Sequence, residues 1–374
     1  MRHLRSGRVR LVALLAVVLF ALAALPAGAT VPGANGKIVF GQVFPNYGIT
    51  IDPDGSDPHQ VGPVGTTTCN AWSPDSSKVL CNLWSEEGVE PFTVQPATAN
   101  PDGSGFTLLN PNLPLDLFCL NWSPDGSRLL CHSEGIANPA DAGLYTVRSS
   151  DAGDLVRVST TPPDGFDNGY GYSPDGSRIL YAQFANGHGT LFSVKPDGSD
   201  PVQLSPPALS VIDLGFFDRV GADWAPDGSR VAFAAFDESS RGFRTGLFVV
   251  NADGSDLRQI TPSRIGALSA QWSPNGALIA FTSCVASLRH CGVRQAWVVH
   301  PDGTALGQVT PPVNGASFQT PVWSPDSTKL LLNRQDPGNG PTSLWTVNTD
   351  GSGLFKLADT VTLSSYAWGS APTE

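Results

Sequence analysis

A sequence block close to Trp-Ser-Pro-Asp-Gly-Ser-Arg returns about every fifty residues along this chain. The block occurs six times, with its leading aromatic residue at Trp72, Trp122, Tyr172, Trp224, Trp272 and Trp323. A period of this length is typical of repeated supersecondary units, each of which buries its apolar face only by stacking on its neighbours. The repeat therefore predicts the architecture of the chain, and it does not by itself identify a function.

The first 29 residues are typical of a secretory signal peptide. Four arginines precede an apolar run from Leu11 to Leu25, and small residues end at Ala29. The run is too short to be a comfortable membrane span, and no Cys follows it at the cleavage site to accept a lipid anchor. We expect cleavage after Ala29, a mature chain of residues 30–374 without a membrane span, and a secreted or extracytoplasmic location in the periplasm or outside the cell. An uncleaved N-terminal anchor is the alternative.

The mature chain is acidic. Removal of the four leader arginines from the 22 basic residues would leave 18 against 33 acidic residues, a net charge of −15. Binding to phosphate groups needs clustered Lys and Arg, so we expect no nucleic-acid partner and no anionic membrane partner. The 40 Gly and 32 Pro residues favour short strands joined by tight turns over helical repeats.

Each unit contains the signals of four antiparallel strands. A short apolar segment follows every Ser-Pro-Asp-Gly turn, and a second hairpin carries Asp-Gly between alternating apolar residues, as at Asp197-Gly198. Pro sets φ for the first turn, Asp accepts backbone N–H groups, and Gly takes a positive φ. The basic residue three positions after the Asp, such as Arg128 after Asp125, is placed to pair with it. The Trp is expected to pack between neighbouring units.

The two ends of the chain supply complementary halves of one more unit. The apolar segment Lys37-Ile38-Val39-Phe40 has no Trp block before it, whereas Tyr366-Ala367-Trp368-Gly369 has nothing after it. If the last strand, around Ser365 to Gly369, pairs with the strand after Gly36, the two pieces complete a seventh unit. The sequence thus predicts an all-β, seven-bladed β-propeller of four-stranded antiparallel blades, closed by pairing of the N- and C-terminal strands.

The six blocks resemble the PD40, or TolB-type, WD40-like propeller repeat over nearly the whole mature chain. The resemblance implies a propeller fold, and the family includes envelope scaffold proteins, propeller domains of serine peptidases and some lyases. TolB has an additional α/β domain before its propeller, and the prolyl oligopeptidase group has a hydrolase domain. Here the repeats fill residues 30–374, so we expect a stand-alone propeller.

The six cysteines are placed to form disulfides. Cys69 and Cys119 each lie three residues before a Trp, and Cys81 and Cys131 each lie nine after one. If the hairpin pairs Trp72 with Lys78, Cys69 falls opposite Cys81, and Cys119 likewise falls opposite Cys131, at a Cα separation of about 4.4–6.8 Å. Cys284 and Cys291 flank a hairpin loop and make a third pair. A zinc site is the alternative, but the chain has no Cys-x-x-Cys and no His at ligand spacing.

Motifs for metal binding and catalysis are weak. The segment from Asp52 to Asp57 faintly resembles a calcium loop, but turn chemistry explains it and the Glu that ends an EF-hand loop is missing. The histidines of the mature chain do not gather at one point of the unit, although His188 and His290 share one type of loop. No Gly-x-Ser-x-Gly elbow supports a serine hydrolase. We therefore predict no metal site, no cofactor and no catalytic residues.

The loops that enter the Trp strands are the best candidates for ligand binding, because they differ most between units. The longest runs from Ser205 to Ala222. The predicted ligand-binding residues on these loops are Asp167, Asn168, Phe217, Asp218, Arg219, Arg264, Phe318 and Gln319. Their mixture of aromatic, acidic, amide and arginine side chains suits a protein or glycan of the cell envelope.

The sequence thus favours a secreted, monomeric, non-catalytic propeller that binds a protein or cell-envelope ligand through its loop face. The main alternative is a lyase-type propeller enzyme acting on a polysaccharide. A third is a purely structural module.

Overall fold

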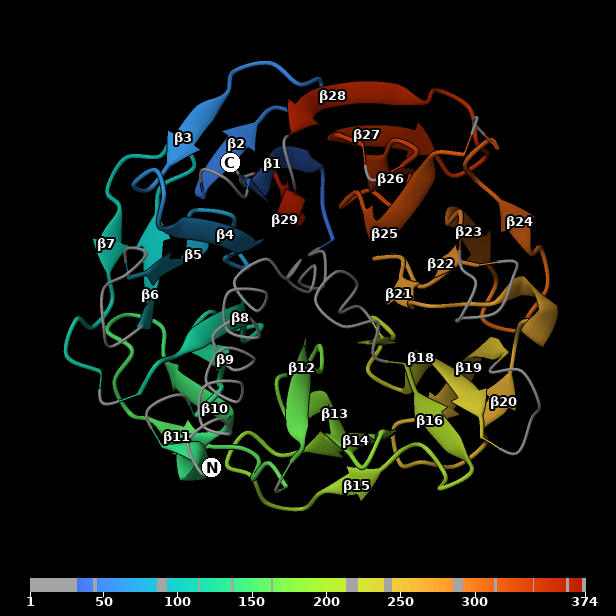
Figure 1. Ribbon diagram of the computed structural model, residues 1–374, viewed down its shortest axis with the longest axis horizontal. Helices are drawn as coiled ribbons and strands as arrows, with labels where there is room; N and C mark the ends of the chain where they lie inside the picture. The colour runs from blue at the N-terminus through green and yellow to red at the C-terminus, as the bar shows by residue number, and fades with distance from the viewer. Residues whose placement is uncertain are drawn as a thin grey trace, which may run out of the picture.

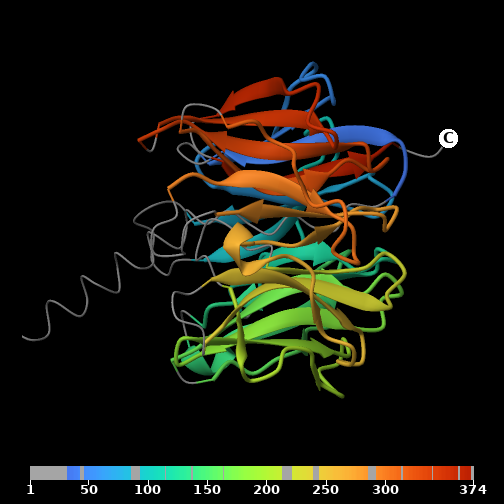
Figure 2. The same cartoon turned by 90° about the vertical axis from the view of Figure 1, so that its right-hand side faces the viewer.

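The structure, a computed structural model, describes residues 32–42, 46–85, 93–113, 115–135, 138–162, 164–212, 221–238, 244–284, 292–312, 315–338, 340–360 and 363–371. Their strands form seven antiparallel sheets arranged as blades around a common axis, which confirms the predicted seven-bladed propeller (Figure 1). The strands cross the disc from one face to the other (Figure 2). The first strand of a blade lies nearest the axis in Figure 1.

The blades follow one another along the chain. Blade 1 contains β4 (Thr67–Trp72), β5 (Val79–Trp84), β6 (Val94–Ala99) and β7 (Thr107–Leu108). Blade 2 contains β8 (Phe118–Trp122), β9 (Arg128–Ser133), β10 (Gly143–Arg148) and β11 (Val156–Arg157), with the 3-10 helix η1 (Pro139–Asp141) between β9 and β10. Blade 3 contains β12 (Phe166–Tyr172), β13 (Ile179–Ala185), β14 (His188–Val194) and β15 (Val202–Gln203).

The remaining blades keep this order. Blade 4 contains β16 (Leu209–Val211), β17 (Ala222–Trp224), β18 (Arg230–Asp237), β19 (Thr245–Asn251) and β20 (Arg258–Gln259). Blade 5 follows the helix η3 (Ser263–Ile265) and contains β21 (Gln271–Trp272), β22 (Ile279–Ser283), β23 (Gln295–Val299) and β24 (Gly307–Gln308). Blade 6 contains β25 (Ser317–Trp323), β26 (Lys329–Gln335), β27 (Thr342–Asn348) and β28 (Phe355–Thr360). Blade 7 joins β29 (Leu363–Ser370) to β1 (Asn35–Gln42), β2 (Tyr47–Ile51) and β3 (His59–Val61).

The ring closes as predicted, through both ends of the chain. Ile38 lies opposite Trp368 and Phe40 lies opposite Tyr366 in the β1–β29 pair. The Tyr366 hydroxyl donates to the carbonyl of Thr320 in blade 6 at 2.6 Å. Blade 7 is therefore held both within its sheet and across to the blade before it, and no inner strand at the seam is left unpaired.

The hydrophobic core lies between blades rather than within one centre. The cluster that holds Phe40, Tyr366 and Trp368 also holds Val322 and Leu331 of blade 6. Trp323 is completely buried, and its indole Nε1 donates to the carbonyl of Gln271 in blade 5 at 3.0 Å. The Trp of the repeat thus packs against the preceding blade, as the sequence predicts, because an aromatic ring of this size contributes most where two sheets meet.

The two neighbouring disulfides, Cys69–Cys81 and Cys119–Cys131, form as predicted. The hairpin register behind the prediction is wrong, however, because Trp72 lies opposite Val79 and not Lys78. A bulge between Cys69 and Ala71 shifts the register by one residue and brings the two cysteines opposite each other. Such close pairing gives Cα separations of 3.9 and 3.8 Å, below the expected range. Cys291 lies outside the described residues, so the third pair stays a prediction.

In blade 4, residues that the sequence assigns to a long loop form part of the inner strand. Part of the segment from Ser205 to Ala222 forms β16, where Leu209 lies opposite Asp237 and Val211 lies opposite Ala235 of β18. After Ile212, whose N–H donates to the carbonyl of Ala234 at 3.1 Å, the described chain resumes at Gly221 and pairs with the same strand. The inner strand of blade 4 therefore consists of two parts, β16 and β17, before and after residues 213–220.

Candidate functional site

A funnel opens along the axis on the face of the disc that carries the Ser-Pro-Asp-Gly turns, called here the turn face. It has a cavity volume of about 280 Å³, and its described lining comes from blades 1, 2, 3, 4, 5 and 7. The lining consists mainly of repeat residues: the aromatic rings of Trp72, Trp122, Tyr172, Trp224, Trp272 and Trp368, and the turn prolines Pro74, Pro124, Pro174, Pro226 and Pro274. The repeat thus builds a ring of aromatic and proline side chains around the axis.

The turns that frame the funnel pack on one another around the ring. Gly126 has a φ of +72°, and a Cβ added to this residue would lie 3.8 Å from the ring of Pro74 in the preceding blade. The same relation joins Gly176 to Pro124 and Gly228 to Pro174. The positive φ favours glycine, as the sequence predicts, although Ser76 and Ser327 take it in blades 1 and 6. The turns also contribute to contacts between blades.

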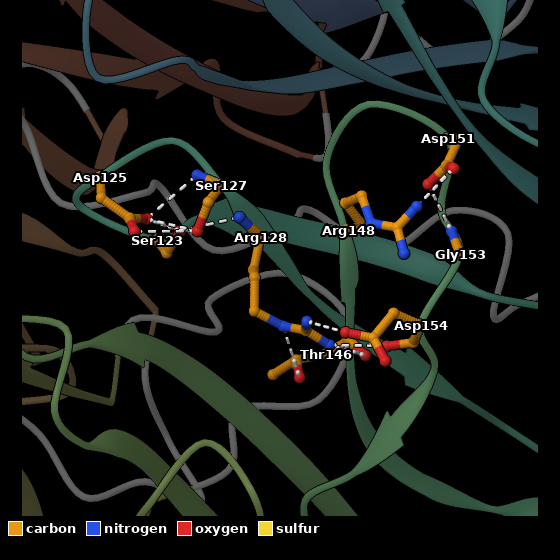
Figure 3. A network of polar contacts seen from close by, with 9 residues as sticks. All are labelled: Ser123, Asp125, Ser127, Arg128, Thr146, Arg148, Asp151, Gly153 and Asp154. Atoms are coloured by element: carbon orange, nitrogen blue, oxygen red, sulfur yellow. Dashed lines mark hydrogen bonds and ion pairs between the residues drawn. The ribbon is translucent and has the colours of Figure 1, made fainter.

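An Asp carboxylate organises the turn, as Figure 3 shows for blade 2, and in blade 5 the amide oxygen of Asn275 takes its place. In blade 2, Asp125 Oδ1 accepts the hydroxyl of Ser123 at 2.6 Å and the backbone N–H of Ser127 at 3.0 Å. The Ser123 hydroxyl oxygen in turn accepts the backbone N–H of Arg128 at 2.9 Å. The hydrogen bond from Ser123, followed by those from Ser127, lowers the pKa of Asp125. The turn is therefore a small self-contained network.

The expected pairing of the turn Asp with the following basic residue is wrong. Arg128 Nη1 contacts Asp154 Oδ2 at 2.6 Å, and Arg128 Nε donates to the hydroxyl of Thr146 at 3.2 Å (Figure 3). Arg178 likewise contacts Asp200 in blade 3. Arg128 begins the second strand, so its side chain extends across the sheet toward the hairpin between the third and fourth strands, away from the turn that precedes it.

Asp223 is the one Asp, Glu, Lys, Arg or His among the described residues that line the funnel. It directly precedes Trp224 at the inner end of blade 4, and its Oδ2 accepts the backbone N–H of Trp272 in blade 5 at 2.8 Å. Protein atoms crowd around this carboxyl group, and the resulting desolvation raises the pKa of Asp223 to about 7, against the opposing effect of hydrogen bonds from Trp272 and Trp224. The carboxyl group is thus poised between its neutral and charged forms near neutral pH.

In other blades too, the residue directly before the repeat aromatic forms a hydrogen bond to the next blade. Asn121 in blade 2 donates its amide to the carbonyl of Tyr170 at 3.2 Å, and Gln271 in blade 5 accepts the N–H of Trp323 at 3.2 Å. Sequence reasoning missed this site. The available signal was that Asp223 is the only ionisable residue directly before a repeat aromatic; the others are Ala71, Asn121, Gly171, Gln271, Val322 and Ala367.

The loop face, opposite the turn face, carries the connections between blades and the hairpins between second and third strands. Asp167 and Asn168 lie there near the start of β12, but both are 8% exposed. Asp167 Oδ2 accepts the hydroxyls of Ser159 at 2.6 Å and Thr161 at 3.0 Å. The oxygens of Asp167 thus fix the entry into blade 3, and its ligand-binding role stays a prediction.

The other predicted residues of this face separate into buried and exposed ones. Phe318 is completely buried among blades 5 and 6, and its ligand-binding role stays a prediction. Gln319 is half-buried, and its amide donates to Gln335 in the same blade at 3.3 Å. Arg264 is exposed on η3. Phe217, Asp218 and Arg219 lie outside the described residues.

An exposed aromatic side chain marks the loop face in blade 3. Phe166 is 41% exposed, and its ring stacks on Phe184 with centroids 4.7 Å apart. Nearby, His188 Nδ1 lies 2.8 Å from Glu238 Oε1 in blade 4. His290, the other histidine of this loop type, lies outside the described residues.

The turn that faintly resembles a calcium loop already has a cation from the protein. Lys37 Nζ lies 2.8 Å from both Asp52 Oδ1 and Asp57 Oδ2. Asp54 accepts the N–H and the hydroxyl of Ser56, at 2.9 and 2.6 Å, as a turn Asp does. Within the described ranges, no group of three or more His, Cys, Asp or Glu side chains is placed to hold a metal ion. The described part of the chain also has no helix long and apolar enough to cross a bilayer.

Comparison with sequences gives limited similarity. No known protein-family profile matches the chain. A curated relative, the uncharacterized protein Atu1656 of Agrobacterium fabrum (strain C58 / ATCC 33970), is 28% identical over 173 residues, which cover 45% of this chain and 55% of the relative. The chain thus spans about half the length of that curated relative.

Comparison with solved structures shows the fold. The propeller domain of the trilobed protease from Pyrococcus furiosus, described as having an open velcro topology, has a TM-score of 0.60 at 12% identity and covers 90% of this chain and 97% of that chain. An oligogalacturonate lyase from Vibrio parahaemolyticus has a TM-score of 0.60 at 11% identity, with 87% and 90% covered. TolB from Acinetobacter baumannii has a TM-score of 0.54 at 15% identity, with 91% and 68% covered. This chain shares the β-propeller fold of a TolB, a lyase and a protease domain.

Proposed function

We propose that this protein is a secreted, non-catalytic propeller that binds a protein or cell-envelope ligand through its loop face. The observation that carries the proposal is Phe166, which exposes an aromatic ring where a strand enters blade 3. Its stacking on Phe184 holds the ring in place without burying it. A fixed, exposed aromatic side chain is typical of the anchors of binding surfaces, because it supplies contact area at a low cost in side-chain entropy.

Two further features support this function. The predicted contact residues Phe217, Asp218 and Arg219 belong to the segment of the sequence that connects β16 to β17 in the neighbouring blade. Two disulfides in adjacent blades fit an oxidising, extracytoplasmic compartment. The structural neighbours include a TolB, a lyase and a protease domain, so the proposal rests on the surface and not on the fold.

The experiment is affinity capture with the mature protein from the producing cell's own envelope and culture medium, followed by measurement of the affinity of the recovered ligand. Phe166→Ser should weaken binding by about tenfold or more, as should replacing Phe217, Asp218 and Arg219 together by Ala. Phe355→Ser is the matched control, because Phe355 is a 52% exposed phenylalanine on β28, an outer strand.

Three outcomes would contradict the proposal. Unchanged affinity in both loop-face variants would exclude the loop face as the binding surface. Equal losses in the Phe166→Ser and Phe355→Ser variants would show a general effect of surface aromatics. Turnover of a polysaccharide by the purified protein would favour the lyase alternative.

A further inference from the structure

The funnel on the turn face has a chemical character that the loop-face function does not use. Its described walls are made by aromatic, proline, alanine, glycine, serine and asparagine residues, and Asp223 is the one residue among them that carries a charge near neutral pH. Pockets for small molecules have this composition, with apolar walls and few polar groups that fix orientation, and their volumes begin near 300 Å³. At about 280 Å³, the funnel lies at the lower end of this range, which suits a small ligand.

The surroundings of Asp223 show which ligand charge the funnel favours. Trp272 and Trp224 contribute backbone N–H groups to the carboxyl group, and within the described ranges no Lys, Arg or His forms an ion pair with it. Removing a carboxylate from water without a counter-charge is unfavourable. An anionic ligand would add repulsion, and a neutral ligand would desolvate the carboxylate further. A cation would offset its charge.

The aromatic lining defines the rest of the ligand. Indole rings attract cations through the negative potential of their faces, and they also contact apolar groups. One of these rings already makes such a contact within the protein, since the Arg230 guanidinium carbon lies 5.1 Å from the centroid of Trp272, although Arg230 itself does not line the funnel. A cation with an apolar body would satisfy both the carboxylate and the aromatic walls.

We propose that the funnel binds an organic ammonium cation, with Asp223 as its counter-charge and the repeat aromatic rings as its walls. The charged part of the ligand lies against the Asp223 carboxylate, and its carbon substituents contact the aromatic and proline side chains. The site is independent of the loop face, because it lies at the other end of the axis.

The protonation state of Asp223 controls this site, because the neutral acid offers no counter-charge. The residues around it are uncharged on each neighbouring element: Ala232 lies opposite it on β18, Trp272 on β21 donates to it, and Tyr172 at the end of β12 lines the same funnel. Two charged residues of its own blade flank the turn that follows it: Arg230, which lies over Trp272, and Asp227. Cation affinity should therefore be constant well above pH 7 and fall as the pH drops below about 7, by up to tenfold per unit.

The test uses isothermal titration calorimetry on the mature protein with choline and with its uncharged isostere 3,3-dimethylbutan-1-ol. At pH 8, choline should bind at least about tenfold more tightly than the alcohol. Asp223→Asn retains an acceptor for the Trp272 N–H, and it should remove this difference by weakening choline alone. The matched control is Asp253→Asn, which removes one exposed carboxylate from a turn of the same blade and should leave both affinities unchanged.

The proposal is overturned if choline does not bind at millimolar concentration, if the two probes bind equally, or if Asp223→Asn leaves choline affinity unchanged. If the Asp223→Asn variant does not fold, the wild-type pH series decides the matter, because choline affinity that does not change between pH 6 and 8 excludes Asp223 as the counter-charge.

Discussion

Asp223 accepts the backbone N–H of Trp272 at 2.8 Å and thereby joins the inner strands of blades 4 and 5. In blades 2 and 5 the same position is occupied by the neutral amides of Asn121 and Gln271, which make comparable bridges. A carboxyl group is therefore not required for the bridge, and its desolvation has consequences for stability that an amide would not have.

The first prediction concerns the pH dependence of stability. Burial raises the pKa of Asp223 from 3.8 to about 7 in the folded chain. Between these values the folded state binds more protons than the unfolded state, so the contribution of Asp223 to the free energy of unfolding falls as the pH rises. The slope is at most about 1.4 kcal/mol per pH unit, and it ends above about pH 7.

The measurement is urea unfolding of the wild type and of Asp223→Asn at pH 5, 6, 7 and 8. Taking the difference between the two proteins cancels the contributions of all other titrating groups. The variant should gain stability relative to the wild type as the pH rises. A difference that is the same at all four pH values would show that Asp223 is ionised throughout, as an ordinary carboxylate is.

The second prediction concerns ring closure. Deleting residues 366–374 removes the strand that pairs with β1 and the Tyr366 hydroxyl that bonds to Thr320. It also removes Trp368, which is 2% exposed. The truncated chain should unfold or associate, because β1 becomes an exposed strand edge. Light scattering and thermal unfolding test this outcome, and a monomer with an unchanged melting temperature would contradict it.

The third prediction concerns the disulfides. Mass mapping of non-reduced peptides should link Cys69 to Cys81 and Cys119 to Cys131, and should find no link from Cys81 to Cys131. In the chain-entropy account, replacing Cys69 and Cys81 by Ser should lower the free energy of unfolding by about 2–3 kcal/mol. The matched control is the corresponding change at Cys119 and Cys131, which close a loop with the same sequence separation of 12. Strongly different losses would show that strain or packing dominates over loop entropy.

The repeat predicted the fold well because its spacing, turn residues and strand signals all agree. Seven blades, closure through both termini and two disulfide pairs follow from positions that recur in the sequence. Side-chain direction and burial were harder to predict. Phe318 and Asp167 occupy the variable ends of inner strands, where the sequence does not show whether a side chain points into the space between blades or toward solvent. The funnel was missed because no single unit contains it, and only the ring brings its aromatic residues together.

The last prediction separates the two partners proposed for Arg128. The sequence places Asp125 three residues before it, but in the structure Arg128 contacts Asp154 and Thr146, while Asp125 is engaged by Ser123 and Ser127. Double-mutant cycles with Ala substitutions should therefore give a coupling energy near zero for Arg128 with Asp125 and a larger, favourable one for Arg128 with Asp154. Because Arg128 also donates to the carbonyl of Asp154 at 2.6 Å, part of its contribution should remain in the Asp154→Ala background and should resist added salt. A larger coupling with Asp125 than with Asp154 in urea unfolding would show that the sequence neighbours, and not the residues brought together by the sheet, form the pair in solution.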